Sequence, residues 1–237
     1  MIRFSVKYMP TNLFSLKDSN STNSGAKALF LPSPYAIKMA ILNQAITIGG
    51  DLDALKAKKS KEFGYVRDAK INFHVLKGSN FCVNNSFVKI LKIKEDKRNK
   101  KDRAAGIPFE SGFTQTVAFR EYIFLSHPLE IIFEVETEEG KTYLQQYLHK
   151  INYFGKRGCF FQFLEYSDIP NEANVQPFQA KLALSGILQE YDDFDEKSTF
   201  DNVDSFSSTT TKRQKKIWIL PLKLVNSSKS FSSYISE

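Results

Sequence analysis

Two glycines bracket two cations in the stretch NYFGKRGCFFQF, which covers residues 152–163. Glycine allows positive φ angles and close approach by another backbone, and free amides in such a turn can bind an anion. Lys156 and Arg157 would then meet phosphates, while Tyr153 and Phe154 could stack on unpaired bases. The alternative is a helix end followed by an exposed basic turn and a core strand, and the local sequence leaves both open. The residues of the candidate phosphate site are Gly155, Lys156, Arg157 and Gly158.

Two further basic runs also allow two interpretations, at residues 95–103 and 212–216. Each is typical of a solvated surface turn, and each would also suit an arm that lies along a phosphate backbone. The cations of the first run are Lys97, Arg98, Lys100, Lys101 and Arg103, and those of the second are Lys212, Arg213, Lys215 and Lys216.

The residues available for catalysis form no recognised motif. None of the three histidines belongs to a His-x-x-His or Glu-x-x-His pair, and the chain has neither a Gly-x-Ser-x-Gly elbow nor a P-loop. A ribonuclease that forms a 2′,3′-cyclic phosphate needs only a general base, a general acid and a cation. His149 with Lys150, or Tyr35 with Lys38, could be assembled into such a site. Structural or solvent-facing roles are favoured for all four residues.

No cofactor or metal is expected. The two cysteines, Cys82 and Cys159, lie far apart and have no metal-ligand spacing. The acidic residues Asp192, Asp193 and Asp195 lack the glycine and the distal glutamate of a calcium loop. A solvated loop is therefore the favoured interpretation of this acidic segment.

The composition indicates a basic protein with enough apolar residues for a core. Of 237 residues, 42% are hydrophobic, and the net charge is +7. This charge favours a polyanionic partner such as nucleic acid. So few cysteines suit a reducing compartment, and no apolar run approaches the roughly 18 residues of a membrane span. Residues 1–10 do not resemble a signal peptide. We therefore expect a cytoplasmic protein with no membrane partner.

Apolar periodicity predicts strands and two main helices in the first 166 residues. Ser33 and Pro34 suit the start of the first helix, and Gly49 suits its end. The strand pair 116–125 and 129–136 is expected to hinge at Ser126-His127-Pro128. Phe160, Phe161 and Phe163 fall in the last strand of this part, where alternation places at least some of them in the core. The predicted strands cover 2–8, 70–76, 87–93, 116–125, 129–136 and 159–166, and the helices 33–48 and 138–151.

This order predicts an α+β fold with a ferredoxin-like, or RRM-like, β-α-β-β-α-β domain over residues 1–166. The Gly-Lys-Arg-Gly segment then lies between the last helix and the last strand. Residues 167–237 form a small C-terminal extension with acidic and basic loops. Within it, residues 217–225 are predicted as a strand with an edge position or a bulge at Pro221, and residues 226–237 as a polar tail.

Two segments, LPSPYAIKMAILNQAI (31–46) and NYFGKRGCFFQF, resemble the CRISPR-associated RAMP superfamily. Within it the chain is most similar to the type I Cascade subunit that caps the 5′ handle of the guide RNA. The resemblance maps the glycine-rich loop of the family onto residues 155–158 and its protruding β-hairpin, the thumb, onto residues near 80–115. In the family these parts hold the handle, and the thumb touches the neighbouring backbone subunit. The implied RNA-binding residues are Tyr35, Lys38, Lys97, Arg98, Lys100, Lys101, Arg103, Arg120, Tyr153, Phe154, Gly155, Lys156, Arg157 and Gly158.

The resemblance also implies partners and an activity. The partners are the guide RNA (crRNA), other Cascade subunits including the repeated backbone subunit and the large subunit, and target DNA through the complex. Most members of the family do not cut RNA. One branch, from type I-C systems, uses a tyrosine, a lysine and a histidine, and its adjacent Lys-His pair is absent here. A non-catalytic subunit is therefore expected; the alternatives are a metal-independent endoribonuclease of CRISPR repeat RNA and an RNA-binding domain of another kind.

Overall fold

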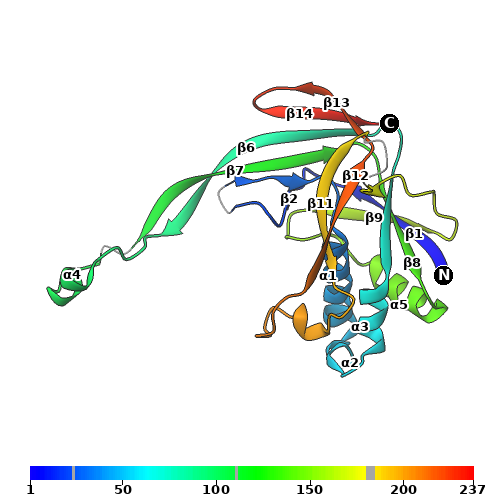
Figure 1. Ribbon diagram of the computed structural model, residues 1–237, viewed down its shortest axis with the longest axis horizontal. Coiled ribbons are helices and arrows are strands. Elements are labelled where there is room, and N and C mark those ends of the chain that lie inside the picture. The colour runs from blue at the N-terminus through cyan, green and yellow to red at the C-terminus, as the bar shows by residue number, and fades with distance from the viewer. Residues whose placement is uncertain (23–24, 110–111, 180–184) are drawn as a thin grey trace.

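The computed structural model describes residues 1–22, 25–109, 112–179 and 185–237, and its mixture of helices and strands confirms the α+β class (Figure 1). The helices are α1 (Pro34–Gln44), α2 (Leu52–Lys56), α3 (Lys61–Asp68), α4 (Lys100–Ala104) and α5 (Glu138–Leu148), with a π-helical turn at Ala45–Gly49 and a 3-10 turn at Phe200–Asn202. The strands are β1 (Ile2–Pro10), β2 (Leu16–Lys17), β3 (Gly25–Ala26), β4 (Ala28–Leu29), β5 (Lys70–Val75), β6 (Asn80–Ile93), β7 (Phe113–Leu125), β8 (Leu129–Val135), β9 (Phe161–Ser167), β10 (Gln176–Pro177), β11 (Ile187–Phe194), β12 (Arg213–Leu220), β13 (Leu222–Ser227) and β14 (Phe231–Ser236).

A four-stranded antiparallel sheet, in the order β5-β8-β1-β9, forms the centre of the protein. The alternation in β1 buries Phe4, Val6 and Tyr8 completely, because one face of the strand packs against the core. Phe4 stacks on Phe133 of β8, its partner in the antiparallel register, at 5.2 Å between ring centroids. Helices α1 and α5 connect strands of this sheet and lie on one side of it (Figure 1).

The first long helix begins as its sequence predicts. The hydroxyl of Ser33 accepts a hydrogen bond from the amide of Ala36, and Pro34 occupies the first turn. The helix then widens into the π-helical turn, and Gly50, rather than Gly49, has the left-handed conformation that ends it. The predicted span of residues 33–48 is therefore confirmed, with a different terminating glycine.

Strands β6 and β7 form a long hairpin that projects from the body and carries α4 at its tip (Figure 1). We call this hairpin the thumb. The thumb was predicted near residues 80–115. Its first strand starts at Asn80, as predicted, but its second strand extends beyond that range to Leu125. The predicted pairing of β7 with β8 is wrong, because β7 pairs with β6 whereas β8 pairs with β1 and β5. Ser126-His127-Pro128 therefore joins two different sheets.

The C-terminal extension is built into the same hydrophobic cluster as the rest of the protein. Trp218 of β12 contacts the ring of Phe73 at 5.7 Å, and β14 pairs with β6 at the base of the thumb. The predicted strand over residues 217–225 divides at Pro221 into β12 and β13, which belong to different sheets. The segment predicted as a polar tail contains β14. Within the described parts of the chain, no helix is long and apolar enough to span a membrane.

Candidate nucleic-acid interface

Residues 153–160, here called the glycine loop, form a closed turn between α5 and β9. Tyr153 and Phe160 pair as an antiparallel bridge, and the amide of Cys159 donates to the carbonyl of Lys156 at 3.2 Å. The amide of Phe154 donates to the carbonyl of Cys159, also at 3.2 Å. These bonds satisfy the inner backbone of the loop. The side chains of Lys156 and Arg157 are left exposed to solvent.

Both glycines of the loop have a backbone reason for being glycine. Gly155 and Gly158 have φ angles of 68° and 98°, which side-chain-bearing residues rarely adopt. Gly158 is the third residue of the hydrogen-bonded turn that starts at Lys156, where a positive φ is typical of a type II turn. A Cβ on Gly155 would lie 3.0 Å from Cδ2 of Leu16. The loop therefore packs against β2, and a larger residue at position 155 would have to displace the side chain of Leu16.

The aromatic residues of the loop divide differently from the prediction. Phe154, predicted to stack on bases, is completely buried and contacts the rings of Tyr8 and Phe161, each at 5.1 Å. That prediction is therefore corrected: Phe154 belongs to the core. Tyr153 is half-buried, whereas Phe160 is 43% exposed. The alternation of β9 could have identified Phe160, because Phe161 points inward and its neighbour must point outward.

The cations of the loop remain available to a ligand. Within the described residues, neither Lys156 nor Arg157 takes part in an ion pair, whereas most cations on nearby strands do. The loop itself is fastened from below, since Asn12 donates to the carbonyl of Gly158 at 3.3 Å. Two unpaired cations on a fixed turn are a suitable contact for phosphate groups.

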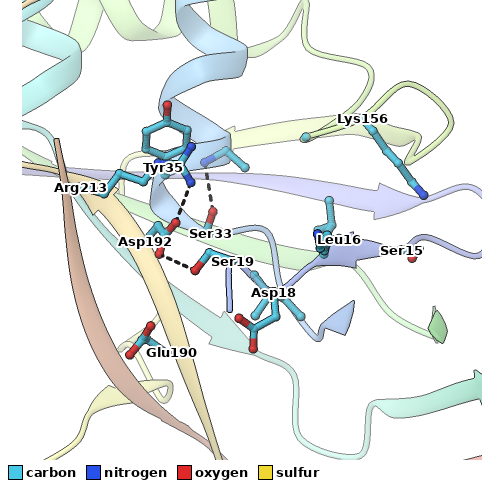
Figure 2. Close-up of a pocket in the computed structure, with 14 residues that line it drawn as sticks. Ser15, Leu16, Asp18, Ser19, Ser33, Tyr35, Lys156, Glu190, Asp192 and Arg213 are labelled. Carbon is cyan, nitrogen blue, oxygen red and sulfur yellow. Dashed lines mark hydrogen bonds and ion pairs between the residues drawn. The ribbon is translucent and has the colours of Figure 1, made fainter. Parts of the chain in front are cut away.

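A cavity of about 340 Å³ opens beside the loop (Figure 2). Gly155 and Lys156 form one end of it, and Leu16 lies beside them. The other end combines the start of α1 with residues of β11 and β12 in the C-terminal extension. Segments far apart in the sequence therefore meet at the glycine loop. The lining residues at that second end are Ser33, Tyr35, Ala36, Glu190, Asp192 and Arg213.

Tyr35 and Arg213 form a layered contact at this second end. The guanidinium carbon of Arg213 lies 4.0 Å from the centroid of the Tyr35 ring, and Tyr35 meets Phe194 edge-on at 5.2 Å. Arg213 also donates to Asp192 at 2.8 Å, which fixes the guanidinium. Tyr35 thus lines the same cavity as the glycine loop, at the opposite end, and is half-buried beneath Arg213. Arg213 was absent from the predicted site, and its basic run was the only signal in the sequence.

Lys38 is not available to RNA, which corrects its predicted role. Its side chain is buried, with Nζ 2.7 Å from Oδ1 of Asp193 and 2.8 Å from the carbonyl oxygen of Arg67. The ammonium also lies over the ring of Phe194. Burial lowers the pKa of Lys38, and the carboxylate of Asp193 opposes that shift. The residue joins α1 to α3 and β11 instead of facing solvent.

The predicted cations of the thumb lie at its tip, away from the glycine loop (Figure 1). The guanidinium of Arg98 makes two hydrogen bonds to Asp96 at 2.8 Å each and a third to the carbonyl of Ile107. Arg103 also pairs with Asp96, at 3.4 Å. These two arginines therefore stabilise the tip itself. The three lysines of the predicted set, Lys97, Lys100 and Lys101, are exposed to solvent.

Arg120 is half-buried in β7, where its guanidinium donates to the carbonyl of Phe119 at 2.7 Å. It faces Ser86 across the thumb and pairs with Ala26 of β3. Arg120 is therefore not among the residues that line the cavity beside the glycine loop.

One face of the thumb is apolar and exposed. In the antiparallel register, Phe87 faces Phe119, Lys89 faces Val117 and Ile93 faces Phe113, so these residues share a face with Leu91. The same face is buried at the base of the thumb, where Phe81 and Leu125 join the core. Further out, Phe119 is half-buried, whereas the exposed fractions of the other apolar residues run from 55% for Val117 to 75% for Phe87, with Leu91, Ile93 and Phe113 between them. Such a contiguous patch is typical of a surface that a partner covers.

The pairs considered for ribonuclease chemistry are His149 with Lys150 and Tyr35 with Lys38. The ring of His149 contacts Phe163, and its Nδ1 lies 3.0 Å from the carbonyl oxygen of Gln145. In the second pair, Lys38 is buried and binds Asp193 and the carbonyl of Arg67. The described residues contain no group of three or more histidine, cysteine, aspartate or glutamate residues able to hold a metal ion. Cys82 and Cys159 are free cysteines.

Comparisons with known proteins give little support for any family. No family model matches the sequence, and no curated protein matches it. A solved structure described as a CRISPR protein from Archaeoglobus fulgidus covers 100% of this chain and 92% of that chain, with a TM-score of 0.41 and 12% sequence identity. Similarity at this level identifies neither a shared fold nor a shared function.

Proposed function

We propose that this protein is a non-catalytic, guide RNA-binding subunit of a type I CRISPR Cascade surveillance complex. In this proposal it holds the 5′ handle of the crRNA and contacts the adjacent backbone subunit, within a cytoplasmic complex that targets DNA under RNA guidance in antiviral defence. The large subunit and the target DNA are further partners through the complex. The observation that carries the proposal is the glycine loop, which presents two unpaired cations on a fixed turn.

The position of that loop supports an RNA-binding role. Its cations follow α5 and precede β9, so they lie where the resemblance to the RAMP superfamily places a glycine-rich RNA-binding loop. The strand order β5-β8-β1-β9, with every neighbouring pair antiparallel, agrees with a ferredoxin-like domain. Single-stranded RNA is generally bound by cations that contact phosphates and by exposed aromatic rings that stack on bases. Lys156, Arg157 and Phe160 supply these groups as exposed residues of the glycine loop.

The thumb supports contact with another subunit. Its exposed apolar face would be a liability in an isolated protein, because a contiguous apolar patch favours association. The lysines at its tip limit self-association by repulsion and favour a partner whose surface carries carboxylates or phosphates around an apolar centre. The adjacent backbone subunit, itself bound to the guide RNA, is the partner that we propose for this face.

A salt titration tests the RNA-binding role. The purified full chain is titrated with a labelled repeat-handle RNA at several salt concentrations, beside Lys156→Ala/Arg157→Ala. If both cations contact phosphates, the slope of log K against log salt should fall in magnitude by about 1.4, since each contact with a single strand contributes about 0.7. The control Lys77→Ala/Lys229→Ala removes the same charge from exposed positions elsewhere. An unchanged slope in the loop variant, with an intact fold, would reduce the loop to a turn.

The same RNA tests the absence of catalysis. The protein is incubated with labelled repeat RNA in EDTA, and the products are separated on a denaturing gel. We expect intact RNA. Specific cleavage that disappears in His149→Ala would establish the alternative, a metal-independent endoribonuclease. His149 is suited to this control because it is exposed and its replacement should leave the fold intact.

A further inference from the structure

We propose that the cavity beside the glycine loop holds one unpaired nucleotide of the bound RNA, with its phosphate at Lys156 and its base stacked on Arg213. This inference rests on the proposed function, because it assumes that RNA lies on the loop. It adds a base-recognition site that depends on the C-terminal extension, which the resemblance to the RAMP superfamily does not cover.

Arg213 has the properties of a stacking platform. Its guanidinium is planar, and the ring of Tyr35 supports one face at 4.0 Å. Asp192, which is itself buried, holds the guanidinium from the edge at 2.8 Å. The Arg213 side chain is still 40% exposed and lines the cavity, so its other face can receive a ring. Unpaired bases stack on guanidinium planes as well as on aromatic rings.

The charges of the cavity separate a phosphate end from a base end (Figure 2). Lys156 lies at the loop end, Asp18 lies near the middle beside Leu16, and the carboxylates of Glu190 and Asp192 lie toward the end formed by Arg213. Hydrogen bonds from Asn20 and Lys215 lower the pKa of Glu190, so this group stays ionised at neutral pH. Carboxylates repel a phosphate but accept hydrogen bonds from amino groups. The far end therefore suits an uncharged base.

The same charges predict which bases enter. Adenine, cytosine and guanine each present an exocyclic amino group that can donate to a carboxylate, whereas uracil has no amino group and offers a single N3–H between two carbonyl oxygens. The carboxylate of Asp18, which accepts the amide of Asn20 at 2.8 Å, is half-buried in the cavity wall. We therefore infer that the site prefers an amino-bearing base over uracil. Its volume of about 340 Å³ is near the lower limit for ligand pockets, which suits a single nucleotide.

An abasic scan tests the site directly. The full chain is titrated with a set of handle-length oligoribonucleotides in which one position at a time lacks its base. One position should stand out, with affinity lower by about 5-fold to 100-fold, which is the usual effect of losing one stacked base. At that position uridine should bind more weakly than adenosine, cytidine or guanosine. Equal loss at every position, or tightest binding with uridine, would overturn the inference.

Arg213→Lys tests the platform while keeping the charge beside Asp192, because lysine has no planar group to stack. In this variant the loss should reach a similar size on intact RNA, and the abasic position should no longer matter. Lys212→Ala is the matched control, since it removes an exposed neighbouring cation outside the cavity lining. If Arg213→Lys binds intact RNA with wild-type affinity, the inference is wrong. The proposed function fails separately, if Lys156→Ala/Arg157→Ala leaves RNA binding and its salt dependence unchanged.

Discussion

Phe154 and Phe160 lie in the same loop, and the structure predicts opposite consequences for their replacement. Phe154 is completely buried and makes edge-to-face contacts with Tyr8 and Phe161 at 5.1 Å each. Replacing a buried phenylalanine by alanine usually costs about 3–5 kcal/mol, because it removes apolar contacts and leaves a cavity. Two aromatic contacts, worth about 0.5–1.5 kcal/mol each beyond their buried area, favour the upper part of that range. Such a loss is a large fraction of the 5–15 kcal/mol typical of a whole protein.

Urea denaturation followed by circular dichroism measures this effect. With an m value of about 3 kcal/mol/M, the midpoint for Phe154→Ala should fall by about 1–1.7 M. The midpoint for Phe154→Leu should fall by less, because leucine leaves a smaller cavity than alanine. Phe160→Ala should stay within about 0.5 kcal/mol of the wild type, since the ring is largely exposed. Its RNA affinity should instead fall about 5-fold to 100-fold if the ring stacks on a base.

The refuting result is equally specific. A wild-type midpoint in Phe154→Ala, together with weakened RNA binding, would show that this ring is a stacking platform and that the loop does not pack as described. Strong destabilisation by Phe160→Ala would contradict its exposed position.

Three other predictions concern the loop, the alkaline range and the thumb. Gly155→Ala should lower stability by about 1–2 kcal/mol in thermal unfolding, because alanine is disfavoured at positive φ and its Cβ would meet Leu16; an unchanged melting temperature would contradict the packing against β2. Burial raises the pKa of Tyr166 to about 12, so the unfolded state loses this proton first and stability falls as pH rises from the ordinary value of 10.0 toward 12. Tyr166→Phe should weaken that fall in urea titrations between pH 9 and 11, and an identical pH profile would count against the shift. Leu91→Lys/Phe113→Lys should leave the melting temperature unchanged, since both side chains are exposed, but should abolish co-purification with the proposed backbone subunit; Ile169→Lys/Phe206→Lys, which changes two exposed apolar residues outside the thumb, is the control, and retained co-purification by the thumb variant would refute the docking face.

Local patterns predicted the elements of the central sheet well, because their signals lie within a few residues. The alternation of β1 and the start of α1 at Ser33 and Pro34 are examples. Pairing between distant segments was less predictable. Ser126-His127-Pro128 has the composition of a hairpin turn, yet it separates two sheets. β14 is rich in serine, so its weak apolar alternation gave little indication of a strand.

The candidate site shows the same division between local and distant information. The positive φ angles at Gly155 and Gly158 follow from their place in a tight turn, which the sequence indicated. Lys38 is buried because it pairs with Asp193, and the Tyr35 ring is covered because Arg213 lies over it. Both partners come from the C-terminal extension, and no local pattern specifies which helix that extension covers.

The pairing of β14 with β6 also constrains how the protein is made. β6 leaves the ribosome well before β14, so one edge of the thumb has no partner while synthesis continues. Open strand edges favour pairing between chains, and partly synthesised multi-strand proteins are prone to aggregation. The base of the thumb is closed only after residues 231–236 have emerged, when the amide of Gly78 can donate to the carbonyl of Ser236. The free edge of β6 is therefore covered only once β14 has been synthesised.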